Sequence, residues 1–389
     1  MTAGQRQAGL TVGILGGGQL GLMLAESLDR LGQNVVVLEA DQDSPCAQRR
    51  SNVLNGSPAD PKALAAFFSR VDIATFDSEN TPASPLMPYA AKLAPSLRVL
   101  EITQDRAKEK TFLRDFGFVP VQYELVMPGA DVQAAVRRFG LPCIAKSVLG
   151  GYDGKGQHRL TTDAEVSAMP GNAPGGWVLE ELLQLDSEVS CLVARDTKSA
   201  VTFPIFENLH AHHILDLTVL PARVAPAVQD EARKVADGIA RALDLVGLLT
   251  VEFFIGTGRD GVKRLYVNEL APRVHNSGHV TRQACTVSQF DALARILAGI
   301  PVVQPEVHRG AWCMGQLLGE VWLSQGKTGG ALDLTAWQDF PDVVDVYVYG
   351  KREARPTRKM GHFVVHADTP ERAMERAVLF RERLRRPGG

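Results

Sequence analysis

Asn268-Glu-Leu-Ala-Pro-Arg-Val-His-Asn-Ser-Gly-His279 is the stretch around which the rest of the chain is interpreted. It gathers a carboxylate, amide, arginine, two histidines and a serine around a proline and a glycine, which disfavour a regular helix. The apolar run 265–267 precedes it, and the run 250–255 comes earlier; each predicts a strand. Asp260-Gly261 between them predicts a two-residue hairpin turn. We therefore expect a β-hairpin that presents polar groups at its end.

The expected hairpin would place two carboxylates next to each other. If Asp260 and Gly261 are the two turn residues, each pair of opposed residues has numbers that sum to 521, and Glu252 then faces Glu269. Opposed β-carbons lie about 5 Å apart, and like charges there are destabilising unless a cation joins them. Carboxylates with Asn268 beside them suit Mg²⁺, which often binds one or two carboxylates plus substrate phosphates. The alternative is an exposed hairpin in which a bulge at an intervening glycine keeps the acids apart.

The bulk composition indicates a soluble protein of two or three domains. The chain has 389 residues, of which 45% are hydrophobic and 22% charged. No apolar run approaches the ~20 residues of a membrane span, and the N-terminus lacks a signal-peptide core, so we expect a cytoplasmic protein. The net charge of -2 gives no general reason to bind nucleic acid or a membrane. The basic run 381–386 is expected to be a solvated face of a terminal helix.

The five cysteines are scattered without a C-x-x-C pair. Their spacing favours neither a disulfide framework nor a thiolate zinc site. We expect reduced thiols, mostly buried: Cys46, Cys143, Cys191, Cys285 and Cys313.

The N-terminal region alternates strands and helices. Strands are predicted at 11–15, 34–38 and 71–75, with helices after the first glycine-rich turn and over 59–70. This order predicts a parallel, doubly wound sheet, and hence a Rossmann-like domain over residues 1–105.

A glycine-rich turn follows the first strand. Gly16, Gly18 and Gly21 fit G-x-G-x-x-G, and Glu39 lies 18 residues past the last glycine, which is compatible with dinucleotide binding. A helix N-terminus after such a turn binds any phosphate, because free N–H groups and the helix dipole point there. The glycines are also explained by close packing of helix on strand alone.

A charged helix over 101–113 marks the change to a central α+β domain, assigned to residues 106–300. A predicted strand at 143–145 delivers Lys146, and 150–157 then holds four glycines and a lysine. This is not the usual P-loop pattern, but bare N–H groups and an ammonium can close over a polyphosphate. A flexible hairpin tip is the alternative.

Residues 177–183 predict a strand that ends in two acids, with Glu188 five residues further on. Such a strand can offer its backbone to an adenine edge and a carboxylate to the ribose, or it is an ordinary strand with a polar end. His210, His212 and His213 lack the partners of a zinc site, so surface or ligand contacts are favoured.

The last part of the chain, 301–389, predicts a small β-rich domain with a terminal helix. Its clearest strand, 343–349, leads into the loop 350–362, which carries five basic side chains. This loop is either solvated or holds a substrate phosphate.

Taken together, these motifs resemble the ATP-grasp superfamily, and within it the 5-(carboxyamino)imidazole ribonucleotide synthases. The likeness runs from Thr11 to about His362. It implies an ATP-dependent ligase of purine biosynthesis that carboxylates aminoimidazole ribonucleotide with bicarbonate through carboxyphosphate. It also implies Mg²⁺ or Mn²⁺ as cofactor and a homodimer. The motifs that carry it are 16–21, Gln104-Asp-Arg106 with Lys110, 151–157, 268–279, Gly350-Lys351 and 358–362.

The resemblance also implies roles for individual residues. For ATP these are Arg106, Lys146, Gly151, Tyr152, Asp153, Gly154, Lys155, Gly156, Gln157, Glu180, Glu181, Leu182, Leu183, Glu188, His210, Asn268 and Glu269. For the ribonucleotide they are Gln19, Leu20, Glu79, Tyr152, Asp153, Arg273, Asn276, Ser277, Lys351 and Arg358. Glu252 and Glu269 are the implied metal ligands, and Arg273, His275 and Lys155 the implied catalytic residues. Two departures from the family pattern are Thr357, where glycine is common, and the apolar lead-in at 147–149.

Three alternatives differ in what they leave unexplained. A formate-dependent glycinamide ribonucleotide transformylase shares the fold, but Tyr152-Asp153 and Asn276 favour the carboxylating family. An NAD-dependent dehydrogenase leaves Lys146 and the carboxylate pair without a role. A non-catalytic regulator on the same scaffold requires damaged metal ligands, and both acids are present.

Overall fold

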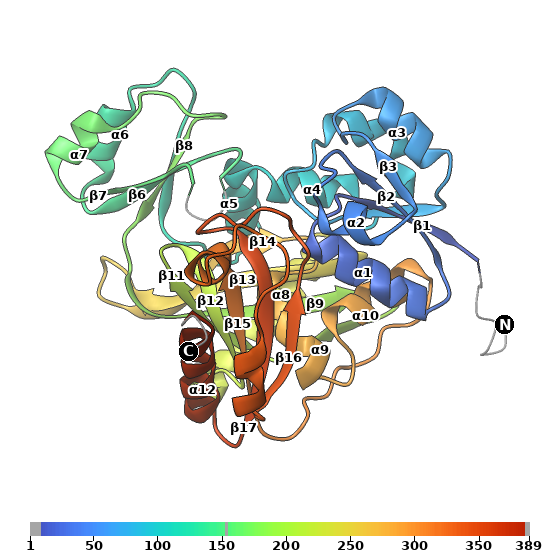
Figure 1. Ribbon diagram of the computed structural model, residues 1–389. Helices are drawn as coiled ribbons and strands as arrows, with labels where there is room; N and C mark the ends of the chain where they lie inside the picture. Colours follow the sequence, from blue (N-terminus) through green and yellow to red (C-terminus); the bar gives the residue numbers. More distant parts are fainter. Residues whose placement is uncertain (1–8, 152–154, 386–389) are drawn as a thin grey trace.

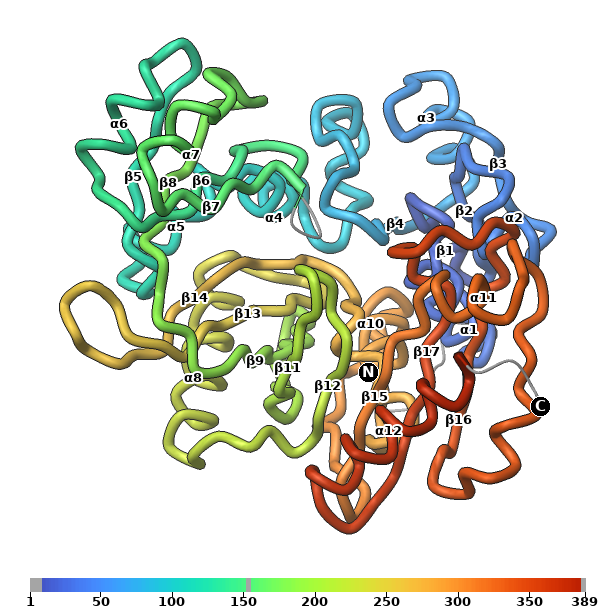
Figure 2. The backbone as a smooth tube through the Cα atoms, turned by 60° about the vertical axis from the view of Figure 1, so that its left-hand side comes forward, coloured from blue at the N-terminus to red at the C-terminus, as the bar shows by residue number. Residues whose placement is uncertain are grey.

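The computed structural model describes residues 9–151 and 155–385. Within them the chain forms two four-stranded sheets and one nine-stranded sheet. The N-terminal sheet and a small lobe stand on either side above the large sheet, as the two views in Figure 1 and Figure 2 agree. No helix in the described part of the chain is both long and apolar enough to cross a bilayer.

The N-terminal sheet is parallel, as predicted. Its strand order is β3-β2-β1-β4, and the central strand β1 is almost fully buried. Helix α1 and strand β1 share a hydrophobic core with α10 and β15 of the large sheet, so this region is not an isolated unit. The elements are β1 (Thr11–Leu15), α1 (Gln19–Arg30), β2 (Asn34–Glu39), α2 (Pro45–Arg49), β3 (Val53–Asn55), α3 (Pro61–Phe68), β4 (Ile73–Phe76), η1 (Ser84–Lys92) and α4 (Leu97–Thr103).

The predicted charged helix over 101–113 is wrong, because the chain breaks it in two. Helix α4 ends at Thr103, and α5 (Arg106–Asp115) starts anew after Asp105. The Asp105 carboxylate accepts hydrogen bonds from the backbone N–H groups of Ala107 and Lys108, both at 3.0 Å. An aspartate that caps a helix in this way favours a non-helical backbone at its own position, which ends the preceding helix.

The small lobe is an antiparallel sheet with the order β5-β8-β6-β7. Asp131 caps α6, and Thr162 forms a capping box with Glu165 at the start of α7. The elements are β5 (Tyr123–Val126), α6 (Val132–Phe139), β6 (Cys143–Ser147), β7 (Gln157–Leu160), α7 (Asp163–Ala168) and β8 (Trp177–Glu181).

The large sheet has the order β14-β13-β9-β11-β12-β15-β17-β16, with β10 beside β9. Alternate residues of β9 pack into different cores: Cys191 and Val193 into the one that contains α8, Leu192 and Ala194 into the one that contains α10. Helices therefore cover both faces. The elements up to residue 297 are β9 (Gln184–Arg195), β10 (Ala200–Thr202), β11 (Phe206–Ala211), β12 (Ile214–Leu220), α8 (Pro226–Ala242), β13 (Gly247–Thr257), β14 (Lys263–Ala271), η2 (Asn276–Val280), α9 (Thr281–Ala284) and α10 (Gln289–Leu297).

The C-terminal strands continue this same sheet, because β15 pairs with β12. Arg381 of the last helix was expected to be solvated, and that expectation is wrong. Its side chain is only 12% exposed and forms a two-pronged ion pair with Asp216 of β12, one arm at 2.9 Å. The remaining elements are β15 (Ala311–Leu318), α11 (Gly319–Ser324), η3 (Thr335–Asp339), β16 (Val343–Val348), β17 (Lys359–Ala367) and α12 (Pro370–Arg385).

The cap on α5 gives a first testable prediction. Asp105→Ala should lower the free energy of unfolding by about 1 kcal/mol, because the first N–H groups of α5 lose their acceptor. Urea denaturation followed by circular dichroism measures this. Asp105→Asn keeps an acceptor and is the matched control; equal losses in both variants would contradict a capping role.

Candidate active site

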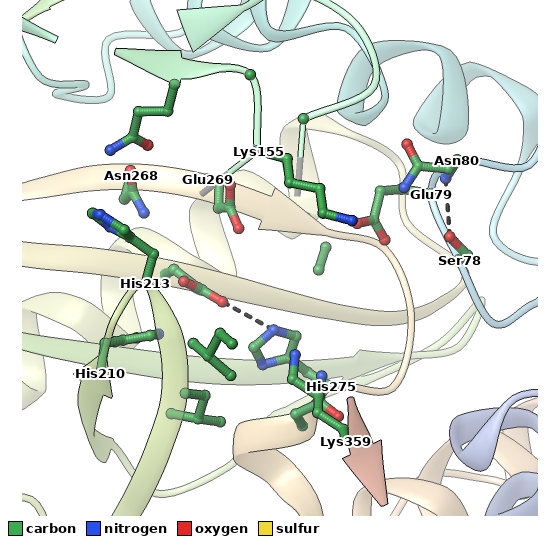
Figure 3. A pocket seen from close by; sticks show the side chains of 18 of the residues that line it. Ser78, Glu79, Asn80, Lys155, His210, His213, Asn268, Glu269, His275 and Lys359 are labelled. Carbon is green, nitrogen blue, oxygen red and sulfur yellow. Dashed lines mark hydrogen bonds and ion pairs between the residues drawn. The ribbon is translucent and has the colours of Figure 1, made fainter. Parts of the chain in front are cut away.

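A cleft of about 890 Å³ lies where the N-terminal sheet, the small lobe, the large sheet and the C-terminal loop meet. Figure 3 shows side chains from these regions pointing into one space. The cleft brings together most of the predicted site residues. Its lining includes Gln19, Leu20, Glu79, Arg106, Lys146, Gly151, Lys155, Gly156, Gln157, Glu188, His210, Glu252, Asn268, Glu269, Arg273, His275, Asn276, Lys351 and Arg358.

The predicted carboxylate pair is present, although the predicted turn is wrong. Glu252 of β13 is opposed to Glu269 of β14. However, the last opposed pair before the loop is Thr257 with Lys263, so the loop has five residues rather than two. The opposed pairs from there to Phe253 with Val267 have residue numbers that sum to 520. Asn268 is the extra residue of a bulge that restores the sum to 521. The bulge therefore brings the acids together rather than keeping them apart.

Helix α5 holds this bulge through two consecutive residues. The Lys110 ammonium donates to the Asn268 carbonyl at 2.9 Å, and the Glu109 carboxylate accepts from the Leu270 N–H at 2.9 Å. Both side chains are buried. Burial also raises the pKa of Glu109 to about 8, although the charge of Lys110 opposes this shift.

The surroundings of the pair fit a hard divalent cation. Burial and the charge of Glu252 together raise the pKa of Glu269. For Glu252, burial opposes ionisation, but His275 beside it lowers the carboxyl pKa. The Asn268 side-chain oxygen is buried and has no hydrogen-bond partner among the described residues. Three oxygen donors, one of them unsatisfied, suit Mg²⁺ and not a thiolate or imidazole metal.

Lys146 of β6 reaches the cleft from a buried ion-pair triad. Its ammonium lies 2.7 Å from one oxygen of Glu180, and the Lys110 ammonium lies 3.0 Å from the other. Burial alone would raise the pKa of the Glu180 carboxyl, but the charges of the two lysines outweigh this effect and lower it to about 2. The predicted contact of the Glu180 carboxylate with adenosine does not fit this geometry, because both oxygens face lysines and the residue does not line the cleft.

The second glycine-rich loop lies against Arg106. One guanidinium nitrogen donates to the Ser147 carbonyl at 3.0 Å and the other to the Gly151 carbonyl at 3.2 Å. A β-carbon at Gly151 would lie 2.5 Å from an Arg106 guanidinium nitrogen, so a larger residue here would displace the guanidinium from its present contacts. Lys155 extends across the cleft toward Glu79 (Figure 3). Tyr152, Asp153 and Gly154 lie outside the described residues.

Of the other predicted adenosine residues, Glu188 and His210 line the cleft, and Glu181, Leu182 and Leu183 do not. Glu188 of β9 and His210 of β11 contact each other, with the His210 Nδ1 atom 2.9 Å from the carboxylate. Burial opposes the protonation of His210, but this contact raises its pKa. Glu181 accepts a hydrogen bond from the Arg259 N–H at 3.0 Å. Leu182 and Leu183 form the link between β8 and β9, half buried and outside the cleft lining.

Arg273 and His275 lie beside the carboxylate pair. Arg273 forms an ion pair with Glu79 of the N-terminal region. Burial opposes ionisation of Glu79, but the charge of Arg273 lowers the carboxyl pKa. The His275 Nε2 atom lies 2.9 Å from a Glu252 oxygen (Figure 3). A cation and an imidazole thus stand next to the acids, on the side of the N-terminal region.

The predicted ribonucleotide residues come from the N-terminal region, η2 and the C-terminal loop, with one correction. The Gln19 amide donates to the Asn276 side chain at 3.4 Å, which joins the first glycine-rich turn to η2. Lys351 and Arg358 face the cleft, and burial with nearby Arg358 and Lys359 lowers the pKa of Lys351 to about 8. The Ser277 hydroxyl is fully buried, so direct contact with a substrate is not compatible with this geometry.

The first glycine-rich turn does not offer a phosphate site. The Gly17 N–H donates to Glu39 at 2.6 Å and the Gly18 N–H to Asp77 at 2.9 Å. Two carboxylates occupy the donors that a pyrophosphate needs, and they would repel it. Burial raises the pKa of Asp77 to about 6, although the Gly18 N–H opposes this shift. The dinucleotide interpretation is wrong for this turn.

Sequence reasoning missed the roles of several residues around the cleft. The burial of Glu109 and Lys110 could have been predicted from the sequence, because the apolar residues Phe112 and Leu113 lie one turn further along the same side of the helix. Asp77 carries no such signal, since its contact with the first glycine-rich turn depends on the pairing of β1 with β4.

Comparisons with known proteins agree with this geometry. The ribonucleotide synthetase preATP-grasp domain family matches residues 10–104, the ATP-grasp domain family 111–290, and the phosphoribosylaminoimidazole carboxylase C-terminal domain family 313–376. The N5-carboxyaminoimidazole ribonucleotide synthase of Staphylococcus epidermidis is 36% identical over 366 residues, covering 92% of this chain and 93% of its own.

Two solved structures are similar along nearly the whole chain. The Staphylococcus aureus N5-carboxyaminoimidazole synthetase with ADP has a TM-score of 0.85 at 31% identity, covering 96% of this chain and 97% of its own. The Aspergillus clavatus N5-carboxyaminoimidazole synthase with ADP and 5-aminoimidazole ribonucleotide has a TM-score of 0.83 at 27% identity, covering 96% and 99%.

A lysine-bearing antiparallel lobe placed over a carboxylate pair on a larger sheet, with these domain matches, defines an ATP-grasp ligase. Similarity along nearly the whole chain identifies the family within this class of ligases. The chain belongs to the N5-carboxyaminoimidazole ribonucleotide synthase family, ATP-dependent enzymes of purine biosynthesis that use aminoimidazole ribonucleotide and bicarbonate. The transformylase and dehydrogenase alternatives are therefore set aside.

The buried triad gives a second prediction. Glu180→Gln should destabilise the protein by about 3 kcal/mol near neutral pH, because it leaves two lysines without their buried counter-ion. The folded pKa is about 2, below the ordinary 4.5, so the stabilisation is present above 4.5 and is lost as the pH falls toward 2. Denaturant titrations of both proteins between neutral pH and about pH 3 measure this.

The matched control is Glu124→Gln, in the same lobe. Glu124 pairs with Arg138, whose side chain is 66% exposed, so its loss should cost under about 1 kcal/mol. A difference between wild type and Glu180→Gln that stays constant down to low pH would contradict the ionised triad.

Proposed function

We propose that the cleft carries out the reaction in two steps. A bicarbonate oxygen attacks the γ-phosphorus of ATP, and ADP leaves with formation of carboxyphosphate. The amine of aminoimidazole ribonucleotide then attacks the carboxyphosphate carbon, and phosphate leaves. The single observation that supports this best is the placement of the paired acids between Lys146 on one side and Arg273 with His275 on the other.

We assign the triphosphate to the space between the small lobe and β14. Arg106, Lys146 and Lys155 supply cationic donors there, and Gly151, Gly156 and Gln157 line the same part of the cleft. The adenosine lies along Glu181, Leu182, Leu183, Glu188 and His210, where the link between β8 and β9 offers backbone groups. Glu180 acts indirectly, by holding Lys146 in place.

Mg²⁺, or Mn²⁺ in its place, would be held by Glu252 and Glu269 with Asn268 beside them, and would neutralise charge on the triphosphate. In the described residues no cluster of three or more His, Cys, Asp or Glu side chains offers a complete protein cage. The pair therefore suits a cation that takes its remaining ligands from substrate phosphates and water.

Arg273 and His275 are assigned to bicarbonate and carboxyphosphate. A fixed guanidinium and an imidazole next to the reacting groups offset negative charge as it develops. The ribonucleotide lies against Gln19, Leu20, Glu79 and Asn276, with its phosphate on Lys351 and Arg358. The lowered pKa of Lys351 follows in part from two neighbouring cations, an arrangement that an anionic phosphate would relieve.

We further propose domain limits at about residues 105 and 300. The break before α5 and the end of α10 support them. A homodimer is proposed from the family resemblance. A reducing cytoplasmic setting is supported by the five cysteines, all of which are buried and free.

The reaction itself gives the third prediction. ADP release should require Mg²⁺ and should rise when aminoimidazole ribonucleotide and bicarbonate are both present. Coupled measurement of ADP with each candidate amine in turn tests this. Stimulation by glycinamide ribonucleotide with formate, and not by the expected pair, would overturn the proposal.

The paired acids give the fourth prediction. Glu269→Gln should reduce turnover by at least about 10²-fold, because one charged ligand of the cation is lost. It should also remove the thermal stabilisation that Mg²⁺ with ADP gives the wild type, since a ligand stabilises a protein only when it binds. Glu306→Gln, at an exposed position outside the cleft, is the control. An unchanged Mg²⁺ shift in Glu269→Gln would contradict the metal role.

A further inference from the structure

A buried chain of polar side chains runs from His275 into the large sheet. The His275 Nδ1 atom lies 2.9 Å from the Ser277 hydroxyl, which lies 3.0 Å from the Ser190 hydroxyl. The Asn208 side-chain nitrogen lies 2.8 Å from the same Ser190 oxygen, and the Asn208 oxygen lies 3.3 Å from the Thr218 hydroxyl. Ser190, Ser277 and Thr218 are fully buried, and Asn208 is 6% exposed. The three strands β9, β11 and β12 thus contribute to a path that ends on a residue of the cleft.

The hydrogen bonds of this chain can run in one consistent direction. Thr218 donates to the Asn208 oxygen, and the Asn208 amide donates to Ser190. Each serine hydroxyl has a single proton. Within the described residues Ser277 is the remaining partner of the Ser190 hydroxyl, so Ser190 donates to Ser277. Ser277 must then donate its own proton to the Nδ1 atom of His275.

An independent backbone contact supports this direction. The Ser277 N–H, a donor that cannot be reversed, points at the same Nδ1 atom at 3.3 Å. Two donors on Nδ1 leave it without a proton, and a neutral imidazole then carries its proton on Nε2. The Nε2 atom is the one that lies 2.9 Å from Glu252 at the cleft.

The backbone of His275 is fixed as well. Gln289, which is fully buried, accepts from the His275 N–H at 2.8 Å and donates to the His275 carbonyl at 2.7 Å. This two-point contact holds the residue while the polar chain sets the orientation of the ring. Backbone and ring are therefore held by different elements, the backbone by α10 and the ring by the polar side chains that lead into the large sheet.

We infer that Ser277, Ser190 and Asn208 are positioning residues that hold His275 with its proton on Nε2, so that it presents a hydrogen-bond donor to the cleft. The inference rests on the proposed function, in which bicarbonate and carboxyphosphate lie beside His275. In the structure this donor is directed to Glu252. Where Glu252 would bind the cation, the Nε2–H donates to an anionic oxygen of these groups, and Nε2 does not remove a proton from the amine or from bicarbonate. The Ser277 residue, which the family resemblance placed on the substrate, acts through His275.

The first test reads the tautomer directly, without any turnover. Long-range ¹H–¹⁵N spectra of protein labelled on histidine nitrogens distinguish a proton on Nε2 from one on Nδ1. The His275 signals are identified by their loss in His275→Gln. We expect the wild type to carry the proton on Nε2; a wild-type His275 with its proton on Nδ1 would overturn the inference.

The second test reverses the direction of the hydrogen bonds between Asn208 and His275. In Asn208→Asp the carboxylate only accepts, so Ser190 donates to it, Ser277 donates to Ser190, and the His275 proton is drawn to Nδ1. In mildly alkaline buffer, which favours the ionised carboxylate, we expect the Nδ1–H signal to appear. We also expect kcat to fall by about 10²-fold, the size of effect seen when one donor to a developing anion is lost, with KM for ATP unchanged.

The control is Asn172→Asp, the same substitution at an exposed position. Wild-type spectra together with wild-type kcat in Asn208→Asp would overturn the inference. Ser190→Ala removes the directing hydroxyl but keeps the Ser277 N–H on Nδ1, so it should lower the share of the Nε2–H form without abolishing it, and it serves if the aspartate variant does not fold. An unchanged Nε2–H share there would count against a positioning role for Ser190. If aminoimidazole ribonucleotide and bicarbonate fail to stimulate ADP release, the proposed function fails while the tautomer result stands on its own.

Discussion

The bulge at Asn268 is the constraint on which the site depends. Two like charges on opposed strands repel each other, and a regular hairpin has no reason to keep them side by side. Here the cost is offset locally: Glu109 and Lys110 of α5 bind the backbone on either side of Glu269, while His275 stands against Glu252. A helix from one side and a loop from the other thus fix the two acids side by side, as the proposed metal role needs.

The same principle of fixed counter-charges extends outward from the pair. Glu180 holds Lys146 and Lys110 together, and Glu79 holds Arg273, so Lys146 and Arg273 each face the cleft from a fixed acid. Anchored cations lose little freedom when an anionic substrate arrives, which is what preorganised electrostatic catalysis demands. Lys110 links both sets, since it contacts the Asn268 carbonyl and the Glu180 carboxylate at once.

The sequence predicted those parts of the site that local patterns determine. Alternating strands and helices gave the parallel sheet, and the apolar runs around the hairpin gave the opposed acids. The prediction that Glu252 faces Glu269 was correct through two errors that cancel: the loop is longer than assumed, and Asn268 is an extra residue in the second strand. A bulge of this kind has no recognisable sequence pattern, so neither error could be seen in the sequence. The helix break at Asp105 was readable in principle as a capping residue, but the charged residues after it look like one continuous helix. Contacts such as Ser190 with Ser277, 87 positions apart, depend on how strands are ordered in the sheet and have no local signal.

The first glycine-rich turn illustrates how tertiary structure can reverse a local pattern. Its sequence pattern is that of a phosphate site, yet Glu39 and Asp77, at the ends of neighbouring strands, accept the hydrogen bonds of its backbone N–H groups. A turn that carries two carboxylates repels phosphate, so an anionic part of a ligand must lie elsewhere in the cleft. Lys351 and Arg358 of the C-terminal loop also line the cleft and supply positive charge there. In the proposed arrangement, acids on the N-terminal turn and cations on the C-terminal loop orient the phosphorylated sugar, with its hydroxyls toward the turn and its phosphate toward the loop.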